Sequence, residues 1–327
     1  MRHTLPALIG LLVLALWGCE ALKTSKPIMP IKEYERLVVG RFDADYVGTD
    51  RCLSACHSHD KIRRDFEAST MGAQLSPETG LPLVDCESCH GPGSLAIEGI
   101  TAEKVQEAKA EGQELACKYE TLIDLKALPA GALSLICLKC HTANATFNLH
   151  DWSSSAHAMA EVSCSDCHRI HAGPDLIVHP EETAKMCYEC HQNVRAEFSL
   201  PSRHPVPEAK VFCTDCHEPH GTSSPRMLRA ETVRATCLRC HGEKGGPYVY
   251  EHAENTEDCL GCHANHGSPN NYLLNVKVPF LCLQCHEGHS TDTAEARQAH
   301  FTRCTDCHSQ IHGTDVPGAG GEGTFTQ

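Results

Sequence analysis

The chain has 327 residues, a formal net charge of −14 and only 5% aromatic residues, yet it contains 22 cysteines and 23 histidines. Its length would suit two ordinary domains, but it has few large apolar side chains to fill their cores. The acidic balance excludes a nucleic-acid-binding protein, since such proteins need a basic surface.

The N-terminus has the pattern of an export signal. Leu5 to Trp17 form an apolar run that is too short to span a bilayer. The run ends at Gly18-Cys19, as in bacterial lipoprotein signals, where the cysteine is lipidated and becomes the new N-terminus. We therefore expect a lipoprotein signal peptide over 1–18 and an anchor linker over 19–45, with an ordinary cleaved signal as the alternative. The next residue is not an inner-membrane retention aspartate, so we expect an outer-membrane lipoprotein on the periplasmic side.

Ten pairs of cysteines are each followed at once by a histidine, and nine of them read Cys-x-x-Cys-His. This is the attachment signal of c-type haem, in which both thiols add to haem vinyl groups and the histidine binds the iron. The spacing suits this chemistry, because one short turn places both sulfurs along one porphyrin edge and the next side chain under the metal. The nine cysteine pairs are Cys86 and Cys89, Cys137 and Cys140, Cys164 and Cys167, Cys187 and Cys190, Cys213 and Cys216, Cys237 and Cys240, Cys259 and Cys262, Cys282 and Cys285, and Cys304 and Cys307. Their proximal histidines are His90, His141, His168, His191, His217, His241, His263, His286 and His308.

The tenth motif comes first in the chain and carries one extra residue, Cys52-Leu-Ser-Ala-Cys56-His57. We expect a haem here too, bound through Cys52, Cys56 and His57, with a local disulfide as the alternative. The expected cofactor content is therefore ten haems c, nine on Cys-x-x-Cys-His and one on Cys-x-x-x-Cys-His. Cys117 lies outside every motif; we expect a semi-buried thiol, with a redox or cross-linking role as the alternative.

Other uses of these cysteines explain the pattern less well. Zinc also takes Cys and His ligands, but zinc sites would require the motifs to be used in pairs. A disulfide framework in an exported protein would need no histidine after the second cysteine. The recurrence of the histidine therefore favours haem.

The spacing of the motifs predicts the organisation of the chain. Ten motifs fall within the 256 residues from Cys52 to Cys307, about one per 26, so each porphyrin should contact its neighbours as much as it contacts protein. We expect a two-motif region over 46–135 with a helical insertion at 101–125, an eight-motif repeat region over 136–312, and a disordered tail over 313–327. The expected fold is a multihaem cytochrome c: short α-helices and irregular loops around a stacked haem array, extended and repeat-like, with little or no β-sheet.

The repeat is two motifs long. His157, Cys164-Ser-Asp-Cys-His168 and His171 are matched by His204, Cys213-Thr-Asp-Cys-His217 and His220. The plan recurs at His252, His263 and His266, and more loosely at His308 and His312. A histidine three residues after a motif cannot reach its own iron, which the motif histidine already occupies. We therefore expect it to reach another haem and tie neighbouring modules together.

Histidines outside the motifs decide whether the sixth coordination position of each iron is filled. A second histidine makes an electron carrier, whereas an open position permits catalysis. Twelve histidines remain after the ten proximal ligands and His3 of the signal, which is enough to give every iron a second axial histidine. They are His59, His150, His157, His171, His179, His204, His220, His252, His266, His289, His300 and His312. A surface or propionate-bonding histidine is the alternative for any single one.

From Tyr46 to about Gly313 the chain resembles the MtrA/DmsE type of decahaem cytochrome. The shared features are Tyr46-Val47-Gly48, Cys86-Glu-Ser-Cys-His-Gly-Pro-Gly93, Ser202-Arg-His-Pro205, Glu251-His-Ala253, and Cys282-Leu-Gln-Cys-His286 followed by His289. The resemblance implies an electron conduit, in which a row of haems passes through an outer-membrane β-barrel porin. It also implies distal ligands at His157, His171, His204, His220, His252, His266, His289 and His312.

Two family positions depart from this pattern near the N-terminus. Where the family has histidine before glycine, this chain has Ser69-Thr70-Met71-Gly72, and after Gly91-Pro92 the expected histidine is replaced by Leu95-Ala96. Met71 as an iron ligand would raise the reduction potential relative to two histidines. Met71 as an apolar filler, substitution by His59 or His150, and an open haem are the alternatives.

We therefore expect an electron-transfer protein rather than an enzyme, with no acid–base or nucleophilic catalytic residue. The leading hypothesis is a conduit across the outer membrane, anchored by lipidated Cys19, with a β-barrel porin and extracellular or periplasmic cytochromes as partners. It would deliver electrons to an extracellular cytochrome, a metal oxide or a reductase. The alternatives are a lipid-anchored periplasmic carrier that feeds a terminal reductase and, less favoured, a reductase of a small oxyanion at an open haem.

Overall fold

The computed structural model describes residues 37–56, 61–69, 71–80, 82–113, 115–141, 149–171, 180–252, 258–287, 303–318 and 325. The chain divides into two compact units, unit 1 of Met1–Cys56 and Cys86–Ala127 and unit 2 of His57–Asp85 and Leu128–Gln327. The predicted signal peptide and Cys19 lie outside the described residues. Among the residues that are described, no helix has both the length and the apolar character needed to span a bilayer.

Unit 1 is built on short helices around a small apolar core. Its elements are α3 (Thr49–Ala55), α5 (Cys86–His90), α6 (Ala102–Glu111) and η1 (Tyr119–Thr121). Ala55, Cys56 and Ile97 form a buried cluster, against which Ile100 and Cys117 pack. Unit 1 therefore has a core made of protein side chains.

The helical insertion predicted over 101–125 is shorter than expected. It begins where the Thr101 hydroxyl accepts a hydrogen bond from the Lys104 amide, as an N-cap does. It ends at Gly112, whose φ of 65° is the left-handed conformation that stops a helix. A helix therefore lies within the predicted range, but the longer helix of the described chain is α7 (Ala130–His141), with 12 residues against 10 in α6. The chain from residue 115 returns to the core of unit 1.

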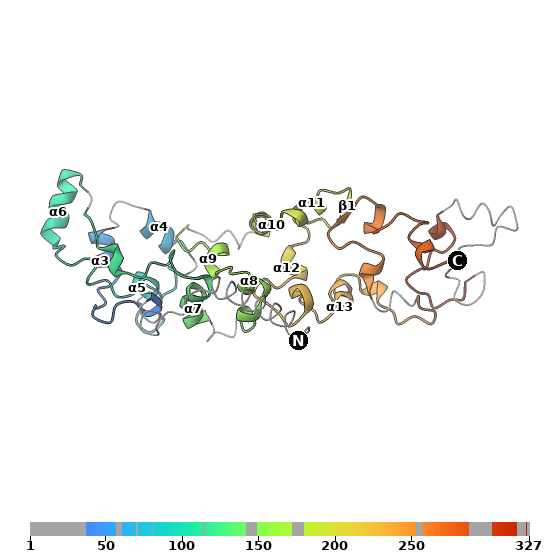
Figure 1. Ribbon diagram of the computed structural model, residues 1–327, viewed down its shortest axis with the longest axis horizontal. Coiled ribbons are helices and arrows are strands. Elements are labelled where there is room, and N and C mark those ends of the chain that lie inside the picture. Colours follow the sequence, from blue (N-terminus) through green and yellow to red (C-terminus); the bar gives the residue numbers. More distant parts are fainter. Residues whose placement is uncertain are drawn as a thin grey trace, which may run out of the picture. The chain divides into compact units, whose positions relative to one another are not determined.

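Unit 2 contains the remaining elements, and Figure 1 labels the larger ones. Its helical elements are α4 (Ile62–Glu67), α7 (Ala130–His141), η2 (Trp152–Ser154), α8 (Ala156–Met159), α9 (Cys164–Cys167), α10 (Pro180–Tyr188), α11 (Gln192–Glu197), α12 (Cys213–Cys216), η4 (Pro225–Met227), α13 (Val233–Leu238), η5 (Gly242–Lys244), η6 (Cys259–Gly261), η7 (Asn271–Leu273), η8 (Cys282–Gln284) and η9 (Cys304–Asp306). Two short strands, β1 (Ser202–Arg203) and β2 (Gly267–Ser268), pair antiparallel and form the one sheet of the described chain. Short helices, irregular loops and little sheet confirm the predicted fold class. The domain boundary predicted between 135 and 136 falls within α7.

The two-motif repeat is visible in the backbone hydrogen bonds of unit 2. After the motif at Cys213, the amide of Arg229 donates to the carbonyl of Cys216, and after the motif at Cys259 the amide of Asn275 donates to the carbonyl of Cys262, both at 2.9 Å. The loops between these residues also share a pair of positive φ values, at 226–227 and at 272–273. Equivalent sequences therefore fold into equivalent loops.

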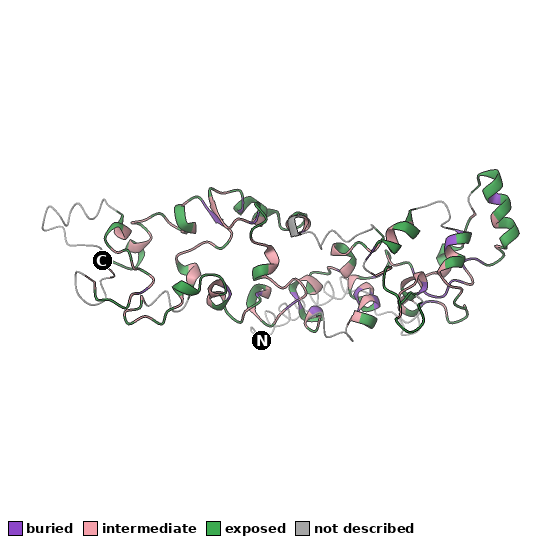
Figure 2. Cartoon of the chain, turned by 180° about the vertical axis from the view of Figure 1, so that it is seen from behind, coloured by how far each residue is buried: buried purple, intermediate pink, exposed green. Residues whose placement is uncertain are grey.

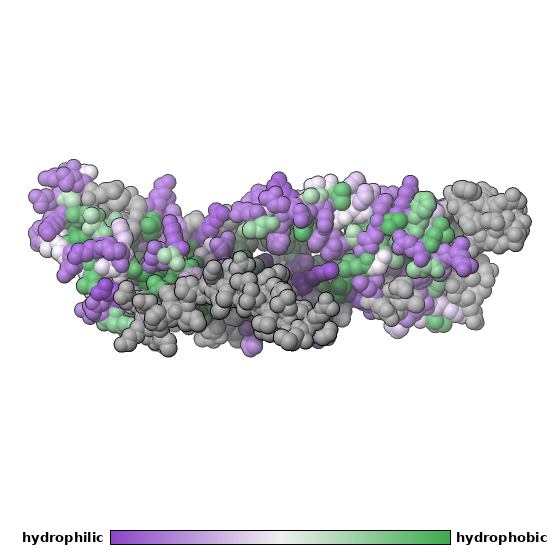
Figure 3. All heavy atoms as spheres, in the orientation of Figure 1, coloured by the Kyte–Doolittle hydropathy of each residue, from purple (hydrophilic) through white to green (hydrophobic). Residues whose placement is uncertain are grey.

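Unit 2 buries apolar side chains only between Leu128 and Leu228 among its described residues. After Leu228, none of the described apolar side chains is buried. Figure 2 shows mainly exposed and intermediate residues in the same part of the chain, and Figure 3 shows hydrophobic residues in separate surface patches. Large apolar residues such as Met159 (75% exposed), Tyr272 (73%) and Phe280 (64%) contribute to that surface. After Leu228, the polypeptide alone therefore does not supply the core that normally holds a fold together.

Candidate haem-binding sites

In each Cys-x-x-Cys-His motif of unit 2 from residue 164 onward, one helical turn links the first cysteine to the histidine. The amide of the motif histidine donates to the carbonyl of the first cysteine, at 2.8 Å in His168 and His308 and at 3.0 Å in His241 and His263. This bond places the histidine directly after the turn that holds both sulfurs. The local geometry therefore agrees with the expectation from the spacing.

Six motif histidines each lie opposite a second histidine from a distant part of the chain. Their ring centres are between 6.0 Å, for His157 and His191, and 6.4 Å, for His217 and His266, apart. The other pairs are His168 with His220 at 6.2 Å, His204 with His241 at 6.3 Å, His252 with His286 at 6.1 Å, and His263 with His312 at 6.2 Å.

This separation suits two imidazoles on opposite sides of one metal ion. A metal–imidazole bond is about 2 Å long and the bonded nitrogen lies about 1 Å from the ring centre, so the two centres should be about 6 Å apart. The ring separation is too long for direct ring stacking in contact. We therefore interpret the six pairs as axial ligand pairs.

Hydrogen bonds hold several of these rings by Nδ1. The Nδ1 of His157 lies 2.9 Å from the carbonyl of Pro219, and the Nδ1 of His204 lies 2.7 Å from the carbonyl of Asn265. A ring that donates from Nδ1 to a carbonyl is fixed in the tautomer that leaves Nε2 free for a metal. His263 is held in the same way by the carbonyl of Tyr272, at 2.8 Å.

Two distal histidines are held by carboxylates instead. The Nδ1 of His266 is 2.7 Å from Oε2 of Glu197, and the Nδ1 of His220 is 3.2 Å from Oε1 of Glu218. Burial lowers the pKa of His220 although Glu218 opposes this shift, and the neutral ring is the form that binds metal. Sequence reasoning missed both carboxylates. Only the Glu218-Pro-His220 spacing offered a signal, since Glu197 is 69 residues from its histidine.

The pairs follow two rules of order. A histidine that precedes a motif faces the histidine of the next motif along, as His157 ahead of Cys164 faces His191. A histidine that follows a motif faces the motif two places earlier, as His220 faces His168. By the first rule His204 and His252 face the histidine of a later motif. By the second rule His266 and His312 face the histidine of an earlier motif. The histidines of six consecutive motifs are thereby each paired with a histidine that belongs to a different motif.

The first cysteines of neighbouring motifs also lie close together. The thiols of Cys164 and Cys137 interact, and this contact lowers the pKa of the Cys164 thiol to about 6. The thiols of Cys187 and Cys213 interact as well, which raises the pKa of Cys187 and lowers that of Cys213 to about 7. These contacts belong to the unmodified thiols and show that the sulfur-bearing edges of neighbouring motifs meet.

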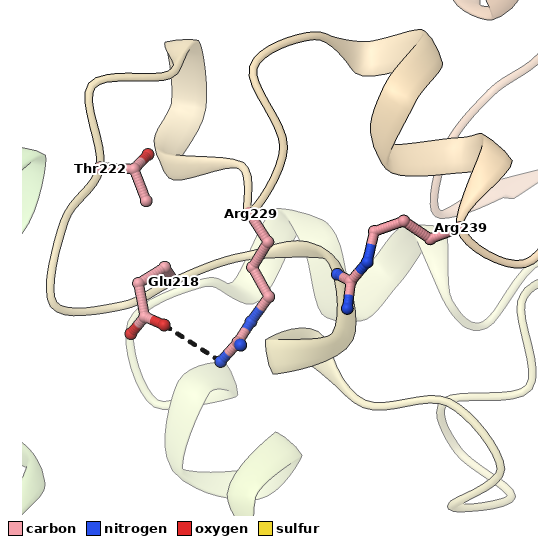
Figure 4. Close-up of a pocket in the computed structure, with 4 residues that line it drawn as sticks. All are labelled: Glu218, Thr222, Arg229 and Arg239. Atoms are coloured by element: carbon pink, nitrogen blue, oxygen red, sulfur yellow. Dashed lines mark ion pairs between the residues drawn. The ribbon is translucent and has the colours of Figure 1, made fainter. Parts of the chain in front are cut away.

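A cavity of about 420 Å³ lies beside the motif at Cys213 and is lined by Glu218, Thr222, Arg229 and Arg239 (Figure 4). Arg229 forms an ion pair with Glu218 at 3.1 Å, and Arg239 donates to the carbonyl of Asp215 at 2.7 Å. The Glu218 carboxylate is therefore shared between Arg229 and His220. The guanidinium groups of Arg229 and Arg239 lie beside a motif, where they are suited to bind the propionate carboxylates of a haem.

Comparison with known proteins agrees with this geometry. The family described as "Doubled CXXCH motif" matches residues 157–196, 204–246 and 252–291, and the family "Cytochrome c554 and c-prime" matches residues 101–169. The multiheme cytochrome MtrA of Shewanella baltica (strain OS185) is 32% identical over 288 residues, which cover 83% of this chain and 79% of the relative. The chain belongs to the MtrA family of multihaem cytochromes. The predicted family is confirmed, as is haem c binding through the Cys-x-x-Cys-His motifs.

The side chains of this multihaem cytochrome fit haem better than a metal held by protein ligands alone. Among the described residues, no three His, Cys, Asp or Glu side chains converge on one point, whereas protein-bound zinc takes three or four such ligands. A porphyrin supplies four ligands itself, so its iron needs two from the protein. The six histidine pairs match that requirement.

Several predicted site residues lie outside the six pairs described above. His57 and His289 lie outside the described residues, as do His59, His179 and His300. His171 is exposed at the end of a described segment. The side chain of His150 is 93% exposed and lies 3.4 Å from Asp151. The proximal histidines His90, His141 and His308 are half-buried.

The irregular first motif differs from the others. Cys56 forms a disulfide with Cys117, with their Cα atoms 6.3 Å apart. The expectation that Cys117 is a lone thiol is therefore wrong, and its cross-linking alternative is the one that the structure has. A sulfur in a disulfide has no bond left for a haem vinyl carbon, so this disulfide and the predicted thioether at Cys56 exclude each other. Cys52, in helix α3, is half-buried.

Proposed function

We propose that this cytochrome carries electrons across the outer membrane along ten covalently attached haems, inside a β-barrel porin partner. The observation that carries the proposal is the continuous series of histidine pairs, which joins six consecutive motifs without a gap. A haem iron with two axial histidines exchanges single electrons and leaves no position for a substrate. The array is therefore suited to transfer rather than to catalysis.

The protein side chains order the array and set its properties. Motif cysteines fix each porphyrin, and distal histidines from other modules fix neighbouring porphyrins relative to one another. Carbonyls at 219 and 265 and the carboxylates of Glu197 and Glu218 select the ring tautomer. No acid–base or nucleophilic group is required in this function, so we propose that the chain is not an enzyme.

The location and partners are part of the same proposal. The lipoprotein-type signal ending at Cys19 supports an anchor on the periplasmic side of the outer membrane. The resemblance to the MtrA/DmsE type supports a β-barrel porin and cytochromes on either side as partners. The final acceptor would be an extracellular cytochrome, a metal oxide or a reductase.

Reconstitution tests the proposal. The holoprotein is inserted with its co-purifying barrel into liposomes that enclose a reducible dye, and a reductant is added outside. We expect the dye to be reduced only when both proteins are present. A His204→Ala variant, which loses one member of a pair in the middle of the series, should slow the reduction, whereas the exposed His150→Ala variant should not.

Two results would contradict the conduit. Holoprotein that reduces free dye but never enclosed dye, and that leaves the membrane without a barrel, would instead indicate the lipid-anchored periplasmic carrier. A high-spin iron signal that responds to nitrite would indicate the oxyanion reductase.

A further inference from the structure

We infer that Met71 is the distal ligand of the haem attached at Cys137 and Cys140, opposite His141, and that this haem has one histidine and one thioether ligand. The inference rests on the proposed attachment of haem at that motif. It is carried by two observations, the local structure around Met71 and the order of the histidine pairs.

The turn that contains Met71 repeats the turn that contains His157, bond by bond. The hydroxyl of Ser69 accepts a hydrogen bond from the amide of residue 72, as the hydroxyl of Ser155 accepts one from residue 158, each at 3.1 Å. Both serines are buried, at 5% and 3% exposure. Met71 and His157 each follow their serine by two residues.

The backbone bonds agree as well. The carbonyl of Ser69 accepts from residue 73 at 3.1 Å, and the carbonyl of Ser155 accepts from residue 159 at 3.0 Å. The carbonyl of Met71 accepts from residue 74 at 3.3 Å, and the carbonyl of His157 accepts from residue 160 at 3.1 Å. Met71 therefore occupies the position in its repeat that His157 occupies in the following repeat, where His157 faces the motif histidine His191.

The order of the pairs identifies the motif that Met71 serves. His157, His204 and His252 each precede one motif and face the histidine of the next motif along. Met71 precedes the motif at Cys86, and the next motif along is the one at Cys137. The rule therefore assigns Met71 to His141, and both residues belong to unit 2.

The chemistry of methionine suits this role. A thioether sulfur is an established haem ligand, and it favours the ferrous state relative to a second imidazole. Met71 is half-buried, and close packing behind it fixes its turn: a Cβ at Gly72 would lie 2.0 Å from the carbonyl oxygen of Phe66. This haem should therefore have a higher potential than the bis-histidine haems that follow it in the chain.

Spectroscopy of the intact ferric holoprotein tests the assignment. Thioether-ligated ferric haem has a weak long-wavelength charge-transfer band that bis-histidine haem lacks, and we expect such a band from one haem per chain. Met71→Leu keeps the apolar volume but removes the sulfur, so it should abolish the band and produce one high-spin haem. Met71→His should abolish the band without a high-spin signal and move one haem to lower potential.

Met159→Leu is the matched control, because Met159 lies on the equivalent turn of the next repeat but is 75% exposed. It should leave the band and all potentials unchanged. A wild-type spectrum without the band, or a band that survives Met71→Leu, would overturn the assignment. If the band behaves as expected but the protein does not reduce the enclosed dye, the assignment of Met71 stands and only the proposed conduit function is contradicted.

Discussion

Units 1 and 2 carry the same haem-attachment motif but are held together by different means. Unit 1 has a buried apolar cluster, a disulfide between Cys56 and Cys117, and a buried carboxylate at Glu87. In unit 2, the buried apolar side chains of the described residues all lie between Leu128 and Leu228, and distant segments meet at pairs of histidines. In unit 1 the polypeptide supplies its own core, whereas in the part of unit 2 after Leu228 the covalently bound haem must do so.

Two carboxylates illustrate the difference. In unit 1, the Glu87 side chain accepts hydrogen bonds from the amides of Val47, Gly48 and Gly93, at 2.7 to 3.1 Å. In unit 2, the Glu197 side chain holds the ring of His266. The first carboxylate joins two stretches of backbone, and the second orients a ligand. The same residue type thus serves folding in one unit and the cofactor in the other.

The largest expected effect is that of producing the full chain without haem attachment. The part of unit 2 after Leu228 should lose its ordered structure, because none of its described apolar side chains is buried by the polypeptide alone. Unit 1 should retain a protected core, held by its apolar cluster and disulfide. Limited proteolysis with mass spectrometry checks this, with cleavage expected first in residues 229–318. Equal protection of both units would contradict the comparison.

Cys117→Ser should alter both the stability and the chemistry of unit 1. The disulfide closes a loop of 61 residues, so its loss should lower the free energy of unfolding by up to about 4 kcal/mol. The released Cys56 would then be available for a second thioether to the first haem. In the native protein that haem should be bound through Cys52 alone, and its pyridine haemochrome should absorb at a longer wavelength because one vinyl group stays conjugated.

Peptide mapping without reduction checks this expectation. Native protein should yield a peptide that joins Cys56 to Cys117, and Cys56→Ser serves as the control, since it also breaks the link but cannot form the second thioether. Native protein with haem on Cys56 and an alkylatable Cys117 would show that the first motif is an ordinary attachment site.

Glu87→Gln should destabilise unit 1 and leave unit 2 unchanged. Loss of the charge that the buried carboxylate shares with three amides should cost about 2 kcal/mol in unfolding free energy. Glu98→Gln is the matched control, because Glu98 forms an exposed ion pair with Lys118 in the same unit and its loss should have no measurable effect. Chemical denaturation followed by near-UV circular dichroism distinguishes the two. Equal midpoints for the two variants would show that the hydrogen bonds to Glu87 do not stabilise unit 1.

The sequence predicted local features well because they depend on short spacings. One turn per motif and short helices follow from residues within about ten positions of one another, and the two-motif repeat was readable because its residues recur in the same order. The end of helix α6 was missed because Gly112 was not recognised as its stop. That glycine was a readable signal.

The pairing of histidines could not be predicted, because partners lie far apart in sequence and the choice depends on how modules stack. His157 and His191 are 34 residues apart, and His217 and His266 are 49. The disulfide left a signal that was only partly used. One irregular motif and one spare cysteine in the same N-terminal region indicated that the two belong together.

The smallest expected effect concerns the potential of a single haem. Glu197→Gln removes the negative charge that lies 2.7 Å from Nδ1 of His266, and that charge favours the ferric state of the iron between His266 and His217. The potential of this haem should rise by about 30 mV, equivalent to about 0.7 kcal/mol for one electron. Unfolding of the protein should be unchanged, in contrast to Glu87→Gln. Redox titration followed by electron paramagnetic resonance measures the shift.

Glu218→Gln provides a graded comparison within unit 2. Its carboxylate is 3.2 Å from His220 and also forms an ion pair with Arg229, so part of its charge is already compensated. The shift at the haem between His220 and His168 should therefore be smaller than the shift caused by Glu197→Gln. Replacement of Arg229 by Gln should move the same haem in the opposite direction, to lower potential, because the carboxylate would then act on His220 alone. Identical shifts for both glutamate variants would show that bulk charge, rather than the contact with Nδ1, determines these potentials.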